Sequence, residues 1–361
     1  MRRSRRLLVT LLLLAIAYVA FGLWVRSRRA DRTLGPPGEI RGAWHVHTTR
    51  SDGRGSLDDV VRAAREAGLQ FVVLADHNVL SPQDAGYRDG VLVLSATEIS
   101  SRYGHVVGAG IPRALTAAEK GGDPFAAVDA LGGRTVLPHP LHPRRPFRAW
   151  GASRAVGLEV ASNDTFWGAT VAGRRVDRIL FALLALPWDR AQAVLAFYDR
   201  PAAELALYDV LSKERPQALL CSADAHGYPS YRAAFEAFSM HVPLTLTGDA
   251  KVDSARVLDA LLAGRATCVF DGVAPGWGMS ISRAGSGPRT ELVLRAPREP
   301  SEVSVYRDGT LTYEGAAPAG SNGGYAACGP AGPVPCARGA WRVEARVDGR
   351  PWLFTNAVRI E

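Results

Sequence analysis

Residues 44–53 read WHVHTTRSDG, and this stretch decides the organisation of the chain. It places His45 and His47 two residues apart, with Asp52 five residues further on. Residues i and i+2 of a β-strand point to the same face, so both imidazoles can be directed at one point. Imidazole and carboxylate groups together suit zinc, manganese or iron, and the stretch therefore indicates a metal site.

A second segment, FVVLADHN at residues 71–78, supports this interpretation. Its apolar run predicts a buried strand that ends on Asp76 and His77. The alternative is two chance histidines followed by a turn at residues 51–53, since Ser-Asp-Gly is good turn chemistry by itself. We prefer the metal site because the second strand end supplies a carboxylate and an imidazole of its own.

The two segments resemble the first two motifs of the PHP (polymerase and histidinol phosphatase) family of metal-dependent hydrolases. The later motifs of that family are matched in the same order along the chain. They are Glu98 in SATEIS, His105 in YGHVVG, His139 in LPHP, and Asp224 and His226 in SADAHG. One such motif would be weak evidence, but the ordered set makes a strong resemblance.

Carried over residue by residue, the resemblance implies three neighbouring positions for divalent metal ions. The first would be held by His45, His47, Glu98 and Asp224, the second by Glu98 as a bridge with His105 and His139, and the third by Asp52, His77 and His226. Asp76 would orient one of the imidazoles. Glu98, Asp224 and Asp52 are the carboxylates expected to matter most for catalysis. The expected cofactors are two or three ions of zinc, manganese or iron.

Strand-like and helix-like segments alternate along the middle of the chain, which predicts an α/β domain with a parallel sheet. A capping box predicts a helix at residues 56–67, and Asp123-Pro124 opens another. The resemblance implies the family's distorted seven-stranded β/α (TIM-like) barrel, which we assign to residues 41–271. The strand candidates are residues 43–47, 71–76, 91–96, 105–109, 135–137, 157–161, 218–222 and 266–270.

From about residue 272 short alternating runs replace this pattern, with turns at Asp308-Gly309 and Asp348-Gly349. Asp-Gly between such runs predicts hairpins, so residues 272–361 are expected to form a small all-β, sandwich-like module. Its closing pattern, DGRPWLFTNAV, resembles the C-terminal module of the carbaryl-hydrolase-like branch of the PHP family.

Residues 7–24 form an uncharged apolar run between a basic N-terminus at residues 1–6 and a linker at residues 25–40. This length is near the lower limit for spanning a bilayer. A signal peptide cleaved at Ala15-Ile16-Ala17 is the alternative. We favour an uncleaved transmembrane anchor because the apolar run continues past that point. The barrel is then expected outside the cytoplasm, on the periplasmic side.

The basic character of the chain is confined to this N-terminal region. The formal net charge is +8, and residues 1–32 contribute eight arginines and one aspartate, or +7. The rest of the chain is therefore close to neutral. A nucleic-acid-binding protein is expected to carry a basic face on its folded part, so we predict no dedicated nucleic-acid surface.

The four cysteines give a second indication of the compartment. Cys328 and Cys336 flank a turn-rich stretch and could close a small disulfide loop in an exported protein; free surface thiols are the alternative. Cys221 and Cys268 lie in apolar, strand-like runs and are predicted to be small buried hydrophobic residues.

Residues 170–215 interrupt the strand–helix alternation. Within them, residues 179–186 are apolar on every side, which predicts a core helix; a surface helix that touches the membrane is the alternative. The preceding residues 163–167 could wall the pocket. Phe166 and Trp167 could stack there on a ring of the substrate, and a place in the core is the alternative for both.

Other polar residues could serve the pocket. His142 is expected either to line it or to lie at the surface. The candidates for a phosphate clamp, each with a solvated surface position as the alternative, are Arg50, Arg102, Arg144 and Arg145.

The chain has neither a G-x-S-x-G nucleophile elbow nor a P-loop. Clustered divalent ions can activate water and neutralise phosphoryl charge without such a nucleophile. We therefore predict a phosphoesterase for a small phosphorylated molecule, such as a nucleotide or an oligonucleotide end. A carbamate, ester or amide hydrolase and a non-catalytic metal-binding envelope protein are the alternatives.

Overall fold

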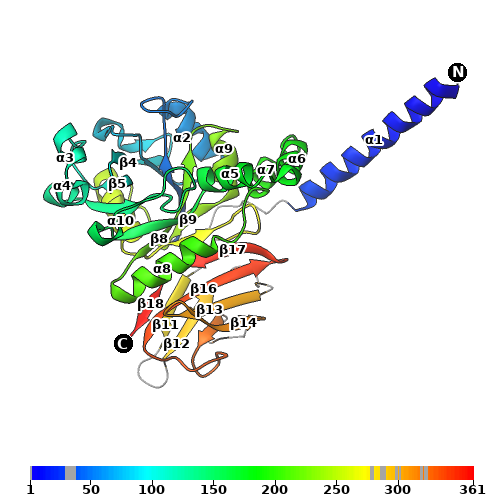
Figure 1. The fold of residues 1–361 in the computed structure, drawn as a ribbon. Coiled ribbons are helices and arrows are strands. Elements are labelled where there is room, and N and C mark those ends of the chain that lie inside the picture. The colour runs from blue at the N-terminus through cyan, green and yellow to red at the C-terminus, as the bar shows by residue number, and fades with distance from the viewer. Residues whose placement is uncertain are drawn as a thin grey trace.

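The computed structural model describes residues 2–28, 38–276, 280–284, 290–296, 300, 302–317, 320 and 324–361. A closed barrel of seven strands dominates the structure, in the order β1-β2-β4-β5-β6-β7-β8 with β8 paired back onto β1 (Figure 1). Its strands, together with the short β3 at its rim, are β1 (Ile40–Val46), β2 (Phe71–Leu74), β3 (Gly86–Arg88), β4 (Val91–Ser101), β5 (Gly104–Ala109), β6 (Arg134–Leu137), β7 (Gly157–Ser162) and β8 (Ala218–Ala225). The predicted seven-stranded barrel is confirmed.

The strand–helix alternation predicted a parallel sheet, but the barrel is not parallel throughout. β5 runs antiparallel to both β4 and β6, because a tight turn between Ser101 and Gly104 reverses the chain. This reversal explains why His105, at the start of its strand, reaches the same end of the barrel as residues at the ends of the parallel strands. In that hairpin His105 pairs with Ser100, two residues beyond Glu98.

The helices cover the outside of the barrel. The predicted capping box is present, since Ser56 Oγ accepts from the Asp59 N–H and the Asp59 side chain accepts from the Ser56 N–H. Asp123 caps the helix that begins at Pro124, also as predicted. The helices that cover the barrel are α2 (Leu57–Glu66), α3 (Ala117–Gly121), α4 (Pro124–Ala130), α5 (Asn163–Ala172), α6 (Val176–Ala185), α7 (Arg190–Leu195), α8 (Ala202–Glu214), α9 (Tyr231–Ala237) and α10 (Ala250–Leu262), with single 3₁₀ turns at Pro82–Asp84 and Trp150–Ala152.

Outside the ring, β9 (Ser239–Val242) pairs with β1, and β10 (Thr267–Val269) connects β9 to β17 of the C-terminal part. The barrel sheet is therefore continuous with one sheet of that part. A second sheet, β11-β12-β15, packs against it around a shared apolar core, as expected for a sandwich (Figure 1). The strands are β11 (Ser280–Ala284), β12 (Glu291–Arg295), β13 (Glu302–Arg307), β14 (Thr310–Gly315), β15 (Tyr325–Cys328), β16 (Gly339–Val347), β17 (Arg350–Thr355) and β18 (Val358–Ile360).

Both Asp-Gly turns close hairpins, as predicted. Asp308 and Gly309 have φ values of +49° and +74°, and Asp348 and Gly349 have +52° and +72°. Two consecutive positive values identify the type I′ turn, which matches the twist of the strands that it joins. The chain leaves the extended conformation between β17 and β18 at Asn356, whose side chain bonds the backbone of Leu219 and Ala266.

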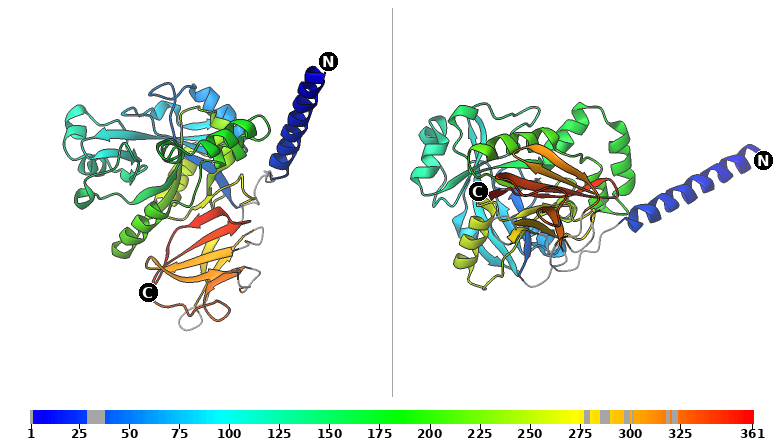
Figure 2. Two further views of the ribbon diagram at one scale, coloured as in Figure 1. Left: turned by 45° about the vertical axis from the view of Figure 1, so that its right-hand side comes forward. Right: turned by 90° about the horizontal axis from the view of Figure 1, so that it is seen from below.

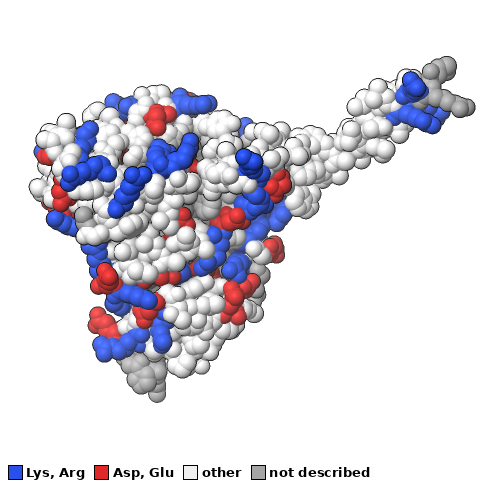
Figure 3. Space-filling view, in the orientation of Figure 1, with Lys and Arg blue, Asp and Glu red and all other residues white. Residues whose placement is uncertain are grey.

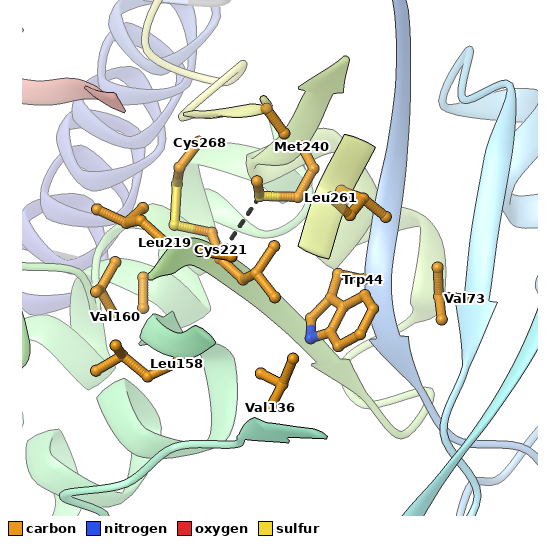
Figure 4. Packing of buried hydrophobic residues seen from close by; sticks show 14 of the residues in the cluster. Trp44, Val73, Val136, Leu158, Val160, Leu219, Cys221, Met240, Leu261 and Cys268 are labelled. Atoms are coloured by element: carbon orange, nitrogen blue, oxygen red, sulfur yellow. Dashed lines mark hydrogen bonds between the residues drawn. A yellow bond between two sulfur atoms is a disulfide. The ribbon is translucent and has the colours of Figure 1, made fainter. Parts of the chain in front are cut away.

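All four cysteines are paired. Cys328 bonds Cys336, as predicted for an exported protein. Cys221 bonds Cys268 and so joins β8 to β10, which corrects their assignment as plain hydrophobic residues. They are buried as expected, and Figure 4 shows their disulfide beside Met240, whose sulfur accepts from the Cys221 N–H at 3.2 Å. Disulfides are typical of oxidising compartments.

The N-terminal helix α1 (Arg2–Ser27) projects away from the rest of the molecule in every view (Figure 2). Among the described residues it is the one helix long and apolar enough to cross a membrane, a property that membrane anchors and signal sequences share. Figure 3 shows its shaft without charged side chains between its base and the arginines at its tip. Residues 29–37 of the predicted linker lie outside the described residues.

The helix α6 is not the core helix that the sequence predicted. Only Ala182 and Ala185 of this helix are buried, and they pack beside Val25 of α1. Val176, Leu180, Leu183 and Leu184 are instead between 40% and 67% exposed. The uniform apolar sequence thus forms two faces, one packed on protein and one that the described residues leave exposed.

Candidate metal centre

The end of β1 directs His45 and His47 at each other. Their Nε2 atoms lie 3.0 Å apart, so the predicted convergence is present. Regular alternation of the strand does not produce it alone, because the pairing of β1 with β2 shifts register between Ala43 and Val46, and His45 has a φ of +65°. A bulge with a positive φ changes the direction of a side chain, and such bulges are common beside active sites.

Glu98 on β4 is the centre of the cluster. Its side chain is 1% exposed, and its two oxygens face different sets of imidazoles. Oε2 lies 3.2 Å from His45 Nε2, 3.4 Å from His47 Nε2 and 3.2 Å from His77 Nδ1. Oε1 lies 2.6 Å from His105 Nδ1 and 2.9 Å from His139 Nε2. This is the arrangement of a carboxylate that can bridge two cations.

Asp224 at the end of β8 completes an inner group with His45 and His47, whose ligand atoms all lie within 4.8 Å of one another. Its Oδ1 is 3.9 Å from His45 Nε2 and 3.5 Å from His47 Nε2. The other carboxylate oxygen accepts a 3.0 Å hydrogen bond from Ser162 Oγ. That bond fixes the carboxylate with one oxygen free for a ligand.

Asp52 forms an outer group at the mouth of the site. Its carboxylate lies 3.4 Å from His47 Nδ1, 3.5 Å from His77 Nε2 and 3.4 Å from His226 Nε2. The side chain of Asp52 is 52% exposed, whereas that of Glu98 is almost completely buried. The nine residues that the sequence nominated as ligands thus lie in one connected cluster.

The sequence analysis predicted no role for one buried carboxylate of the cluster. Glu159 on β7 lies with Oε1 2.7 Å from His45 Nδ1, and the same oxygen accepts from Trp44 Nε1 at 2.8 Å. Its other oxygen accepts from the backbone N–H of His139 at 3.0 Å. Glu159 therefore orients two candidate ligands and leaves His45 Nε2 free for a metal. An acidic residue inside an otherwise apolar strand was the available signal.

Asp76 does not orient an imidazole, which corrects the role that the resemblance implied. Its carboxylate accepts from the Thr48 N–H at 2.7 Å, from Thr48 Oγ1 at 2.8 Å and from Ser51 Oγ at 2.6 Å. It holds the loop that presents Asp52. Gly53 in this loop has no room for a side chain, because a Cβ there would lie 2.5 Å from the carbonyl oxygen of His47.

The buried nitrogens of the cluster fit a set of metal ligands. His77 Nδ1 and His105 Nδ1 are buried without a hydrogen-bond partner among the described residues, although each faces an oxygen of Glu98. Buried polar atoms are rarely left unpaired, and a cation between nitrogen and carboxylate would satisfy both. Mixed imidazole and carboxylate ligands suit zinc, manganese or iron.

The ionisation of the cluster also suits cations. Burial disfavours charged carboxylates, yet the surrounding imidazoles lower the pKa values of Glu98 and Asp224 well below their usual range. Burial lowers the pKa of His77, which favours the neutral form that binds metals. For His45 burial also disfavours the charged form, but Glu159, Glu98 and Asp224 raise its pKa well above the usual value. A metal that binds here would displace a proton from His45.

Three residues of the cluster have positive φ values, at +65° for His45, +31° for His139 and +39° for Asp224. Residues other than glycine adopt this region at an energetic cost of about 1–3 kcal/mol each, and such strain concentrates at functional sites. The surrounding barrel therefore stabilises backbone conformations that these three residues would not favour by themselves.

A cavity of about 420 Å³ adjoins the outer group. Asp52, Asp224 and His226 lie at one end of it, and Arg54 and Arg145 are also in its wall. The remaining lining comes mainly from α5, α6 and α7, so the predicted wall at residues 163–167 is present, as part of a helix.

Of the other three candidates, one lines the cavity and two do not. Trp167 lines the cavity, whereas Phe166 stacks on Tyr198 with ring centroids 4.3 Å apart. His142 is fully buried, with Nε2 3.1 Å from Asp164 Oδ2.

Of the four arginines proposed as a phosphate clamp, Arg145 lines the cavity and pairs with Asp164 at 2.7 Å. Arg50 pairs with Asp84 instead, and Arg102 lies over the Tyr103 ring. Arg144 does not line this cavity. Arg54, which does, was not among the four candidates.

No protein-family model matches the chain, and no curated protein matches it. Among solved structures, a two-domain protein from Bacteroides vulgatus containing a predicted PHP-like metal-dependent phosphoesterase is 13% identical, over 92% of this chain and 99% of that chain, with a TM-score of 0.41. PsfC from Pseudomonas syringae is also 13% identical, over 64% of this chain and 92% of that chain, with a TM-score of 0.41.

A protein from Bifidobacterium adolescentis described as a metal-dependent phosphoesterase is 16% identical, over 52% of this chain and 87% of that chain, with a TM-score of 0.29. These likenesses are distant, and the function proposed below rests on the geometry of the site. None of them tests the resemblance to the carbaryl-hydrolase-like branch, which stays a prediction.

Proposed function

We propose that the protein is a metal-dependent hydrolase of phosphate esters. The observation that carries the proposal is the position of Glu98, whose two oxygens face different sets of imidazoles within 3.4 Å. Bound divalent ions would supply Lewis-acid stabilisation of phosphoryl oxygens and would lower the pKa of water. The ligands in this proposal are His45, His47, Asp52, His77, Glu98, His105, His139, Asp224 and His226.

Two features of the cavity favour a phosphate ester over a carboxylic ester. Arg54 and Arg145 lie in its wall, and guanidinium groups recognise phosphate oxygens with paired hydrogen bonds. The described residues that line the cavity include no serine or cysteine, which disfavours a serine- or cysteine-type acyl transfer but leaves metal-dependent ester hydrolysis as the alternative. Direct attack by water suits both the ligand set and a phosphate ester.

We expect the full-length chain, purified in detergent with manganese or zinc, to hydrolyse bis-p-nitrophenyl phosphate or p-nitrophenyl phosphate. Chelation with EDTA should abolish the activity, and added metal should restore it, because the ions supply the activated water and the charge stabilisation in this proposal. Elemental analysis is expected to find two or three divalent ions per chain.

The same preparation should be assayed with p-nitrophenyl acetate as the control substrate. Faster metal-dependent turnover of the acetate than of both phosphates would replace the proposal by a carboxylic ester, carbamate or amide hydrolase. A metal-free chain that remains folded and fully active would show that the reaction does not require metal ions.

We also propose that α1 is an uncleaved membrane anchor and that the barrel lies outside the cytoplasm. Two disulfides support an oxidising compartment, and one of them, Cys221–Cys268, is inside the barrel region. Alkaline phosphatase fused after Glu361 in a bacterial host is expected to be active, since this reporter needs export to form its own disulfides. The matched control is the same fusion without residues 2–24, which should be inactive. A fluorescent-protein fusion that fluoresces in the cytoplasm, together with an inactive phosphatase fusion, would place the barrel on the cytoplasmic side of the membrane instead.

A further inference from the structure

The cavity beside the metal cluster has two chemically different ends. The polar end is the part lined by Asp52, Asp224 and His226, which lie within 3.7 Å of one another through His226. Arg54 and Arg145 also line the cavity. Its other end is lined by hydrocarbon side chains of α6 and the α7 region, among them Ile179, Leu183, Leu186, Val194 and Phe197. A site that fits one molecule across both ends would select a compound with an anionic group and an apolar part.

The apolar end offers few partners to a polar molecule. The two charged side chains of α6 are occupied by other groups. Arg178 donates to the carbonyl of Phe197 at 3.3 Å and to Asp199 at 2.6 Å, and Asp177 pairs with Arg175 at 2.8 Å. A sugar or a nucleobase placed against these side chains would lose its hydrogen bonds to water without replacement. A hydrocarbon chain gains from burial at the same place.

The apolar lining continues onto the outer surface of α6. Leu183 lines the cavity and is 63% exposed. The exposed Leu180 and Val176 lie three and seven residues before it, on the same face of the helix. Contiguous exposed apolar side chains on a soluble surface mark a binding site or a membrane contact. The cavity therefore opens along an apolar stripe.

The end of α1 fixes this stripe beside the apolar N-terminal helix. Phe21 of α1 packs on Phe181 of α6 with ring centroids 5.6 Å apart. Gly22 lies so close to Trp188, just beyond α6, that a Cβ there would fall 2.1 Å from the indole ring. A bilayer spanned by α1 would thus end at the level of α6, where an amphipathic helix lies in the interface.

We infer that the substrate is a membrane-borne phosphate ester of a lipophilic alcohol, with its phosphate at the metal cluster and its hydrocarbon chain in the apolar end of the cavity. This inference rests on the proposed phosphoesterase function and names its substrate class. In the hydrolysis, the oxygen of water forms a bond to phosphorus and the bond from phosphorus to the leaving oxygen breaks. The leaving oxygen keeps the electron pair and takes up a proton from that water.

The test compares two probes that share one leaving group, octyl p-nitrophenyl phosphate and methyl p-nitrophenyl phosphate. The full-length chain in lipid nanodiscs with manganese is expected to show a kcat/KM at least about tenfold higher for the octyl ester, because several extra methylene groups are buried. Leu183→Asp should reduce the octyl-to-methyl ratio to near one. Leu180→Asp is the matched control, since Leu180 is similarly exposed on α6 but does not line the cavity, and it should keep the ratio.

The outcomes separate this inference from the function on which it rests. Hydrolysis of both esters by the unmodified chain at similar kcat/KM would overturn the lipophilic substrate and leave the phosphoesterase in place. An equal fall of the ratio in both variants would assign the preference to the membrane surface and would overturn the chain site in the cavity. Hydrolysis of neither ester, and of neither phosphate probe named above, with any divalent metal would contradict the phosphoesterase itself.

Discussion

Replacement of Glu98 by glutamine is expected to reduce turnover of the phosphate probes by on the order of a thousandfold or more. Both oxygens of Glu98 face candidate ligand groups, Oε2 toward His45, His47 and His77, and Oε1 toward His105 and His139. An amide keeps one weak acceptor and turns a hydrogen-bond donor toward the other set. The bridge and one unit of negative charge are lost together, in a site where water cannot compensate.

The measurements are kcat, kcat/KM and bound metal by elemental analysis, with thermal unfolding to show that the variant folds. Glu159→Gln is the matched control, because this carboxylate is equally buried but contacts the cluster through His45 and His139. Its loss should be only about 10–100-fold, as for residues that orient a metal ligand. Glu98→Gln with normal activity and full metal content would rule out a bridging carboxylate at this position.

The positions of the candidate ligands could be predicted because each lies in a short motif that resembles one of the PHP family, and the motifs follow the order of the strands along the chain. HVH, DH and DAH all follow apolar runs, and a closed barrel brings the ends of such runs to one place. The capping box at Ser56 and the Asp-Gly turns are equally local signals, and the structure has both. Local chemistry determined these features, so the sequence alone was sufficient.

Features that depend on distant partners could not be predicted. Glu159 is a single acidic residue until the barrel closes and places it 2.7 Å from His45. The resemblance assigned Asp76 to an imidazole, but the Thr48 backbone N–H and hydroxyl group bind its oxygens instead. The disulfide of Cys221 depends on the pairing of β10 beyond the ring, which no local pattern encodes.

The error over α6 has a different physical origin. An apolar sequence indicates that a surface is removed from water, but it does not indicate whether protein or lipid covers that surface. Both faces of α6 are apolar, with Ala182 on the buried side and Leu180 on the exposed side. Only the packing against α1 and α7 distinguishes the two faces, and it leaves the leucine face uncovered.

Asp52→Asn is expected to reduce turnover about a hundredfold or more while the inner group of ligands keeps its metal. Asp52 contacts His47, His77 and His226, and these three imidazoles, against the opposing effect of partial burial, lower its pKa below the usual value. The carboxylate is therefore ionised at neutral pH and can hold a cation at the cavity mouth. A neutral amide is a poor ligand for a hard divalent ion.

The competing explanation is that Asp52 only helps to form the Ser-Asp-Gly turn, and the asparagine variant separates the two. The turn is closed by backbone N–H groups of Ser51 and Gly53 that donate to the carbonyl of Thr48, each at 3.0 Å, so it does not depend on the carboxylate. Asparagine also suits such turns. Asp58→Asn, at an exposed position on α2, is the control and should leave turnover unchanged. If Asp52→Asn likewise keeps full turnover and full metal content, the outer group holds no metal, and catalysis is confined to the cluster around Glu98.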